Sequence, residues 1–419
     1  MMRFAHWSRR ERLGWLALAG IWAGTVVWAA GGELVGDEWV HWSQIHRFLQ
    51  GDTRIYSEYL TNVPGFHWLV TALLAPWGIQ SPGAARGVTA LFTAAAVVLV
   101  YRIRRQLHPA DAQITAAQFF FLPTMFVYGF LVYTDVPALA LLLGALLATL
   151  REHHRAAAAL LLASMAVRQN QVLWVVFLAV LAAWPILCDG AESLRQRRLP
   201  TRAWLAAVLE RTWPYLAVFG VFCAYWAING SIAYSAAQSR YSHPDFHPDI
   251  GNLVFLLATV ALLMPFHVAG GWRHALEGPA SRWMQAAGLA VVVLVAYALW
   301  FRVQHPSNLV LGNMRNQLLA TVAAGGWAWW GLGLLAAIAG GGLCCSPLVA
   351  GRYRLWLPFS LVFVGASWLI ETRYTMIPLT LFLLFRHPQA VWQERLTLAF
   401  WCLLALGFGW LAFAHQRLP

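Results

Sequence analysis

The sequence predicts an all-α polytopic membrane protein, and three observations support this prediction. The 419 residues are 60% hydrophobic and only 11% charged, with a mean hydropathy of +0.58. Apolar runs of roughly 17 to 25 residues recur to the C-terminus, which is the length that a helix needs to cross the hydrocarbon core. No segment between these runs is long or polar enough for a separate soluble domain. We therefore expect residues 1–419 to form a single integral membrane domain in the lipid bilayer.

The basic residues indicate the orientation of the chain rather than nucleic-acid binding. The net charge is +12, the isoelectric point is about 10.0, and all 29 basic residues are arginine. These arginines form short clusters between apolar runs instead of one basic face or tail, so we expect no nucleic-acid partner. The lack of lysine, with abundant alanine, glycine and tryptophan, favours a bacterial genome.

The first apolar run, at 13–31, follows four arginines and is too long for a signal peptide, which predicts a retained span with a cytoplasmic N-terminus. If the run at 64–80 also crossed, the basic cluster at 102–105 would lie outside, against the positive-inside tendency. The Pro64-Gly65 start of that run favours an interfacial or re-entrant helix instead. About thirteen spans are then expected, near 13–31, 85–102, 112–130, 136–150, 156–168, 171–187, 212–230, 251–269, 284–302, 319–343, 355–370, 374–387 and 395–414.

The segments predicted on the outer side carry most of the acids, histidines and amides. They are the first external loop at 32–84, the loops 231–250 and 303–318, and the turns at 133–135, 168–171 and 371–374. A charge near a bilayer costs several kcal/mol unless it is paired or faces water. Convergence of Asp135, Arg168, Glu371 and Arg373 on one side therefore predicts a watery cavity. Alternatively, each of these residues merely ends its helix at the interface.

The first external loop contains a cluster of polar residues with helical spacing. Asp37, His41 and Gln44 follow an i, i+4, i+7 pattern and share one helical face, with Glu38 one step round. Two acids and a histidine just outside a membrane span are candidates for a reaction site. The alternative is an amphipathic surface helix that carries these charges without catalysing anything.

Five motifs in chain order carry a resemblance to a known family. They are Asp37-Glu38-x-x-His41-x-x-Gln44, Thr61 with Pro64-Gly65, Tyr133-Thr134-Asp135, Arg168-Gln169-Asn170-Gln171 before Trp174, and Glu371-x-Arg373-Tyr374 with Pro378. In this order and spacing, the chain resembles the dolichyl-phosphate-glucose α-1,2-glucosyltransferases nearly end to end. It departs from the family pattern in two loops. In the first loop, only Arg240 and His243 match the family pattern. In the second loop, His305-Pro306 and Arg315 match it, but with altered spacing.

The resemblance implies the GT-C architecture of glycosyltransferases, with a helical first external loop that carries the catalytic acid. It also implies a hexose donor, glucose first, linked to a polyprenyl phosphate, and a lipid-linked glycan or other extracytoplasmic acceptor. The chain contains no Gly-rich phosphate loop, so a nucleotide-sugar donor is not expected. No cofactor is expected either. A divalent metal is not favoured because arginine alone can neutralise a lipid monophosphate.

On this interpretation, Asp37 is the general base of a direct displacement with inversion, and Glu38 is the second candidate. Because the chain has no lysine, arginine must bind the leaving phosphate. Arg373 and Arg168 are the first candidates, followed by Arg240 and Arg315. Structural ion pairing is the alternative role of these arginines. The other residues expected to bind substrate are His41, Gln44, Tyr133, Asp135, Gln169, His243, His305, Glu371 and Tyr374.

Two other classes of function stay open from the sequence. A transporter or flippase of lipid-linked or small solutes would use the intramembrane charges as an ion path, although no internal repeats are visible. A non-catalytic partner of a glycan assembly complex is the other. The expected location is a bacterial inner membrane, with the active site on the periplasmic side and an undecaprenyl-linked glycan or envelope polysaccharide as acceptor.

Overall fold

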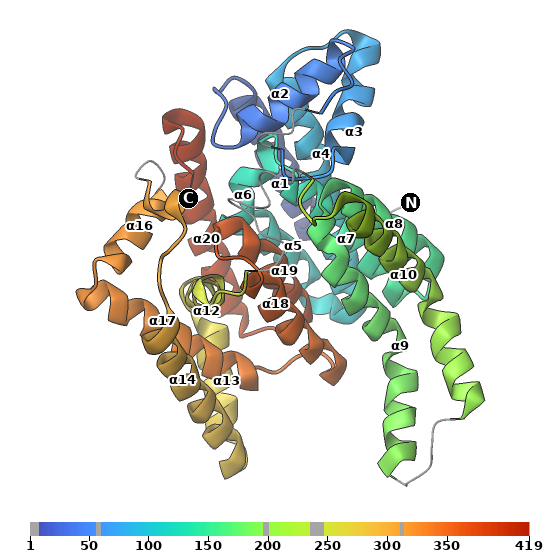
Figure 1. Ribbon diagram of the computed structural model, residues 1–419. Helices are drawn as coiled ribbons and strands as arrows, with labels where there is room; N and C mark the ends of the chain where they lie inside the picture. Colours follow the sequence, from blue (N-terminus) through green and yellow to red (C-terminus); the bar gives the residue numbers. More distant parts are fainter. Residues whose placement is uncertain (1–7, 56–59, 196–200, 235–246, 311–313, 419) are drawn as a thin grey trace.

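The computed structural model describes residues 8–418 except 56–59, 196–200, 235–246 and 311–313, with the backbone alone described for 189–195, 314 and 315. The described residues form helices and one isolated β-bridge, between Leu348 and Arg386. Figure 1 shows α2 and α3 projecting at one end of the molecule and the α9–α10 and α13–α14 pairs extending at the other. The all-α prediction is therefore confirmed for the described residues.

The described elements follow one another along the chain as helices and short 3-10 helices. In order they are α1 (Arg9–Ala30), α2 (Glu38–Leu49), α3 (Gly65–Leu74), η2 (Ala75–Trp77), α4 (Pro82–Leu107), η3 (Pro109–Asp111), α5 (Ala112–Phe120), α6 (Pro123–Phe126), η4 (Val127–Phe130), α7 (Asp135–Leu150), α8 (His154–Val167), η5 (Gln169–Gln171), α9 (Val172–Arg195), α10 (Arg202–Asn229), α12 (Gly251–Leu263), α13 (Pro265–Leu276), α14 (Ala280–Trp300), α15 (Pro306–Leu309), α16 (Met314–Ala323), α17 (Gly326–Cys345), η6 (Gly351–Leu355), α18 (Trp356–Gly365), η7 (Thr372–Thr375), α19 (Met376–Phe385) and α20 (Val391–His415).

Seven of the described helices are long and apolar enough to cross a membrane: α1, α4, α9, α10, α14, α17 and α20. Two sharply bent pairs, α6–η4 with α7 and α12 with α13, raise the number to nine if each pair is one span. The chain is thus a multi-pass integral membrane protein. The expected count of about thirteen stays a prediction, because α8, α18 and α19 have only 14, 10 and 10 residues. All ten residues of α19 are buried. An apolar composition therefore does not by itself distinguish a membrane span from a helix in the protein core.

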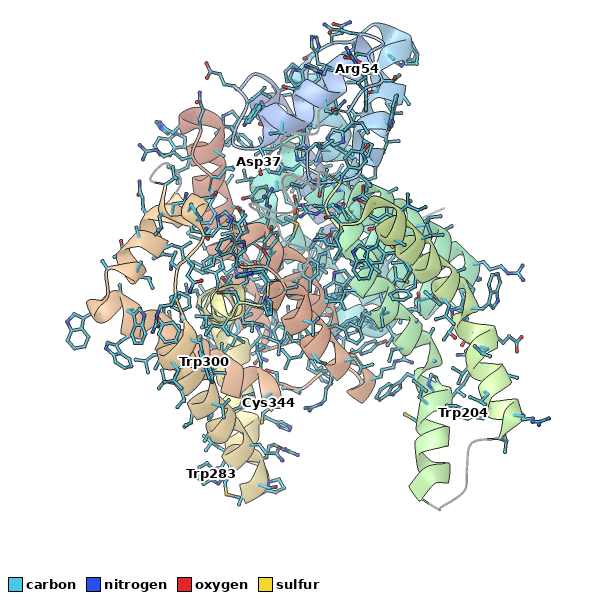
Figure 2. The ribbon with its side chains drawn as sticks, viewed as in Figure 1. Asp37, Arg54, Trp204, Trp283, Trp300 and Cys344 are labelled. Atoms are coloured by element: carbon cyan, nitrogen blue, oxygen red, sulfur yellow. The ribbon has the colours of Figure 1, made fainter. Side chains whose placement is uncertain are left out.

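Exposed tryptophans mark the two ends of one span. Trp283 and Trp300 lie near the two ends of α14 and are 45% and 63% exposed. Seventeen residues of α-helix separate them by about 26 Å, close to the thickness of the hydrocarbon core. Figure 2 shows Trp283 and Trp204 at the end of the molecule opposite to Asp37 and Arg54. These positions fit the tryptophan belts of membrane interfaces.

The helices α2 and α3 lie within the segment 32–84, which the sequence predicts to be the first external loop. Helix α3 has ten residues, or about 15 Å, which is half of the hydrocarbon thickness. Its length therefore agrees with an interfacial or re-entrant helix. A Cβ atom on Gly65 would meet the backbone carbonyl of Ala166 in α8, so only glycine allows this close approach. The stacked rings of Phe48 and Trp68 join α2 to α3.

The long helix α4 carries a buried arginine near each end. Arg86 and Arg104 are eighteen residues apart, which places them about 27 Å from each other along the helix axis. Arg104 forms a two-bond ion pair with Asp111 (2.8 and 2.6 Å) and donates to the carbonyl oxygen of Arg386 at 2.8 Å. The basic cluster at 102–105 thus contacts Arg386, the residue that follows α19. Arg86 belongs to the other end, where the candidate site lies.

Candidate active site

Glu38 anchors the start of the segment 32–84 and points into the protein. Its side chain is fully buried, and its two oxygens pair with the guanidinium of Arg86 at 2.9 and 2.6 Å. The same oxygens accept the backbone N–H groups of Val35 (2.8 Å) and Val132 (2.7 Å). Arg86 also donates to three backbone carbonyls at the end of α1 and just beyond it, those of residues 29, 32 and 33. This network fixes the segment that leads to Asp37.

Asp37 is held by its backbone and presents its carboxylate outward. Its N–H donates to the hydroxyl of Tyr133 at 2.7 Å, and that hydroxyl donates to the carbonyl of Val35. Gly36 has φ +58°, and a Cβ there would lie 2.7 Å from the Tyr133 oxygen, so the loop needs glycine at this point. The Asp37 side chain is 53% exposed, and it makes no capping bond to α2. A carboxylate in this position can reach a substrate.

Arg373 connects Asp37 to a second acid. Its Nη1 lies 3.0 Å from Asp37 Oδ2, and its Nε lies 3.3 Å from Glu371 Oε2. Its guanidinium also lies over the rings of Tyr133 and Tyr374, 5.6 and 5.9 Å from their centroids. Although α2 and η7 are far apart in sequence, the structure therefore brings Asp37, Glu371 and Arg373 together.

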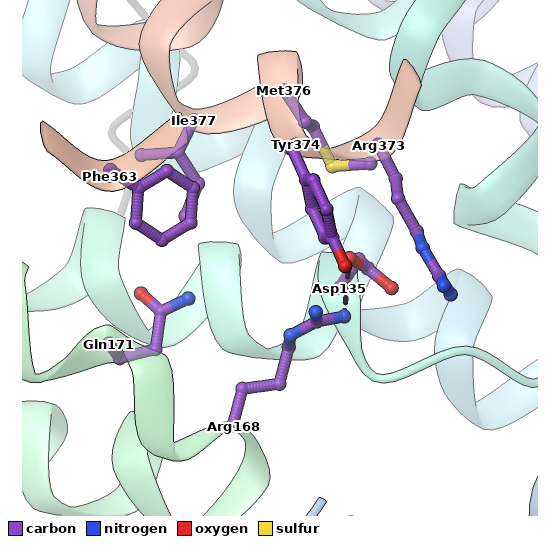
Figure 3. Close-up of a pocket in the computed structure, with 8 residues that line it drawn as sticks. All are labelled: Asp135, Arg168, Gln171, Phe363, Arg373, Tyr374, Met376 and Ile377. Atoms are coloured by element: carbon purple, nitrogen blue, oxygen red, sulfur yellow. Dashed lines mark ion pairs between the residues drawn. The ribbon is translucent and has the colours of Figure 1, made fainter. Parts of the chain in front are cut away.

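A cleft lies beside this arginine, lined by Asp135, Arg168, Gln171, Phe363, Arg373, Tyr374, Met376 and Ile377, with about 250 Å³ of empty space including the part open to solvent. Figure 3 shows Asp135 and Arg168 paired on one side of it, below Tyr374. Their Nη1–Oδ1 distance is 2.5 Å. Asp135 Oδ2 and Gln171 Oε1 are both buried, and neither has a hydrogen-bond partner among the described residues. The cleft therefore contains buried polar atoms whose hydrogen-bonding capacity is unsatisfied by the described residues.

His41 points at a second histidine rather than at the acids. Its Nδ1 lies 3.0 Å from Nε2 of His67, and both side chains are buried. Burial lowers the pKa of His41 to about 4, despite the opposing effect of Asp37. Burial likewise holds the pKa of His67 well below its usual range. Near pH 7 the pair is therefore neutral, so it can donate or accept a hydrogen bond but offers no positive charge to a phosphate.

Three predicted residues hold backbone groups in the structure. Gln44 donates to the carbonyl of Arg54 (3.1 Å), and Gln169 donates to the carbonyl of Thr61 (2.7 Å). His305 accepts the N–H of Ser307 and so caps α15. These contacts shape the loops around the site. Arg240 and His243 lie outside the described residues, as does the side chain of Arg315.

The sequence interpretation did not identify Arg86 or Gln171 as members of the site. Arg86 lies within a predicted apolar span, and a charge there was itself a signal of a nearby acid. Gln171 belongs to a motif that was recognised, but nothing in the sequence showed which of its amides faces the cleft. Within the described part of the chain, no group of three or more His, Cys, Asp or Glu side chains could hold a metal ion. The expectation of a metal-free reaction stays a prediction.

The fold and this polar site define a multi-pass helical membrane protein with a cluster of carboxylates and arginines beside the segment 32–84. The chain belongs to the DIE2/ALG10 family, whose sequence model matches residues 33–310. The family predicted from the five motifs is therefore confirmed.

Curated relatives agree with this family. The mouse Dol-P-Glc:Glc(2)Man(9)GlcNAc(2)-PP-Dol alpha-1,2-glucosyltransferase is 26% identical over 255 residues, which cover 49% of this chain and 52% of that protein. A human protein of the same name is 24% identical over 249 residues, with the same coverage. The chain thus spans about half the length of the curated relatives it matches. Among solved structures, ArnT from Cupriavidus metallidurans bound to undecaprenyl phosphate is similar, with 14% identity, a TM-score of 0.42, and coverage of 97% of this chain and 89% of that one.

Proposed function

We propose that the protein is an inverting GT-C glycosyltransferase that moves a hexose, glucose first, from a polyprenyl-phosphate donor to a lipid-linked glycan or another acceptor outside the cytoplasm. One observation carries the proposal: the half-exposed carboxylate of Asp37 lies 3.0 Å from an arginine that also lines a polar cleft. The curated relatives are named as glucosyltransferases that use Dol-P-Glc, which supports this donor class. The host, proposed to be bacterial, would present the site to its periplasm and supply an undecaprenyl-linked glycan or envelope polysaccharide as acceptor.

In the proposed reaction, an acceptor hydroxyl attacks the anomeric carbon of the donor sugar, and Asp37 takes the hydroxyl proton. The bond between that carbon and the phosphate oxygen breaks, and its electron pair leaves with the lipid phosphate. A new glycosidic bond forms on the opposite face of the sugar, so configuration inverts. Arg373 is proposed to stabilise the phosphate oxygens, because its planar fork of N–H donors matches phosphate geometry.

The charges of the site couple donor binding to the base. Two guanidinium groups, on Arg168 and Arg373, face three carboxylates, on Asp37, Asp135 and Glu371. A donor phosphate must therefore compete with carboxylates for arginine. We propose that Arg373 turns from Asp37 to the phosphate and so frees the base. Arg240 and Arg315 are proposed to add positive charge.

Glu38 is proposed to position Asp37 rather than to accept a proton. Each of its oxygens accepts one backbone N–H and one bond from Arg86. A carboxylate with these four partners has no free oxygen to offer to an acceptor hydroxyl. The catalytic role therefore rests on Asp37.

The test uses purified protein in lipid nanodiscs, synthetic hexosyl polyprenyl phosphates and a panel of lipid-linked glycan acceptors. Asp37→Asn is expected to lower kcat by about 10² to 10⁴-fold, the usual contribution of a general base. Asp52→Asn is the matched control, because Asp52 pairs with Arg54 on the outer loop and is expected to leave turnover unchanged. Unaltered turnover by Asp37→Asn would remove Asp37 from the mechanism. Solute flux in proteoliposomes without turnover of any donor would favour the transporter.

A further inference from the structure

Within the part of the chain that the structure describes, two buried oxygens of the cleft have no hydrogen-bond donor: Asp135 Oδ2 and Gln171 Oε1. We propose that these two side chains bind hydroxyl groups of the sugar that is transferred and so select the donor. This inference rests on the proposed function and assigns a part of the site that the reaction scheme does not use.

The unmet hydrogen bonds point to a ligand rather than to packing. Gln171 is 1% exposed and Asp135 is 8% exposed, and both line the cleft. Buried polar groups in folded proteins nearly always have a partner, since a lost hydrogen bond to water is costly. Asp135 cannot rotate to find one, because its other oxygen is held by Arg168 at 2.5 Å. The free oxygen thus keeps a fixed direction.

The lining of the cleft has the mixed polar and apolar chemistry of a sugar-binding surface. The two unpartnered oxygens and Arg168 form a polar side, while Phe363, Met376 and Ile377 form an apolar one. A pyranose has the complementary surface, with hydroxyl groups at its edge and C–H groups on its faces.

The position of Arg373 identifies this sugar as the donor's. Arg373 lines the cleft and also contacts Asp37. If it holds the phosphate, the group attached to that phosphate through one oxygen lies in the adjacent cleft. A lipid chain would not meet the polar side, whereas a hexose does. The acceptor then approaches Asp37 from its exposed side.

The experiment measures binding and turnover with a short-chain polyprenyl phosphate, either free or loaded with a hexose. Gln171→Met removes the amide and keeps the side-chain length. It is expected to weaken binding of the hexosyl lipid about tenfold and to leave binding of the unloaded lipid unchanged. Gln106→Met is the control, because Gln106 donates to the carbonyl of Leu150 at the far end of α4 and is expected to change neither.

Monodeoxy donors give a second readout, which can already be measured on the wild type. A site that hydrogen-bonds a hydroxyl rejects the analogue that lacks it, so one monodeoxy donor is expected to lose about tenfold in kcat/KM on the wild type. On Gln171→Met, the donor lacking the hydroxyl that Gln171 binds loses no more than about twofold relative to the full donor.

The outcomes separate this inference from the proposed function. Equal weakening of loaded and unloaded lipid by Gln171→Met, no weakening of either, or wild-type protein that does not prefer the loaded lipid would overturn the sugar subsite. If Gln171→Met weakens binding of the loaded lipid alone, but the wild type transfers no hexose, the sugar subsite is supported and the proposed transferase activity is overturned. If Gln171→Met does not fold, a flat response of the wild type to all monodeoxy donors overturns the inference.

Discussion

The buried ion pair between Glu38 and Arg86 offers the sharpest test of how the site is held. Removing one partner of a buried pair leaves an uncompensated charge, which costs about 3–5 kcal/mol of folding free energy. Arg86→Met in addition deprives three backbone carbonyls of a donor, and each unmet buried group costs about 1–3 kcal/mol. Glu38→Gln leaves the Arg86 charge unpaired but keeps an oxygen for a backbone N–H. Both single variants are therefore expected to be strongly destabilised.

The double variant Glu38→Gln Arg86→Met removes both charges together. Its loss of stability is expected to be smaller than the sum of the two single losses by about 3–5 kcal/mol, because no unpaired charge is left. The assay is thermal unfolding in detergent, followed by tryptophan fluorescence, with donor turnover measured below the melting temperature. Because Glu38 positions Asp37, turnover by the double variant is expected to exceed that of Glu38→Gln.

Two results would refute this reasoning. Additive losses of stability would mean that the pair carries no coupling and that Glu38 is held by other contacts. A fully inactive double variant with recovered stability would mean that the carboxylate of Glu38 itself takes part in the reaction. The Asp52→Asn variant sets the baseline for an acid on the same loop that has no such anchor.

Three further predictions concern the surroundings of the site. Burial keeps the pKa of His41 at about 4 and that of His67 low, so at pH 5 these two side chains are protonated only in the unfolded state. The free energy of unfolding is therefore expected to fall between pH 7 and pH 5, by about 2 kcal/mol for His41. Over the same pH range, the melting temperature of the His41→Gln His67→Gln double variant should fall less than that of the wild type. Gly65→Ala places a methyl group against the Ala166 carbonyl and should lower the melting temperature, whereas an unchanged value would show that α3 can move away from α8. Glu394→Gln breaks a buried pair at the far end of α4 and should destabilise the protein by about 3–5 kcal/mol while kcat/KM of the folded fraction stays the same.

The long apolar helices could be predicted from the sequence, and the short or bent ones could not. Hydropathy over about twenty residues identifies α1 and α14, whose apolar windows are only 17% and 11% buried, because lipid on most sides demands apolar residues throughout. The same signal comes from a helix that other helices bury. Predicted spans at 112–130 and 251–269 contain Pro123 and Pro265, and the helices break there because proline lacks the N–H that would continue the backbone ladder.

The acids and arginines of the site could be predicted as a group, but not their partners. Positive-inside reasoning placed Asp37, Asp135 and Arg373 on one side, and the structure brings them to one cleft and its rim. The choice between Asp37 and Glu38 as base was open because adjacent residues on a helix differ in direction by about 100°. Burial separates them: Glu38 turns inward to Arg86, while Asp37 turns outward.

Under the proposed function, this division between neighbouring acids would let the base be fixed in position and still respond to the donor. The backbone of Asp37 is fixed by Tyr133 and by the anchored Glu38, so folding sets the position of the carboxylate. The carboxylate forms an ion pair with Arg373, and a donor phosphate is proposed to attract this arginine. While that arginine stays on Asp37, its guanidinium occupies one of the two carboxylate oxygens. Under the proposed function, the same contact would therefore limit proton transfer until a donor is bound, and Arg373→Lys, which loses the two-sided fork, should increase hydrolysis of the donor relative to transfer.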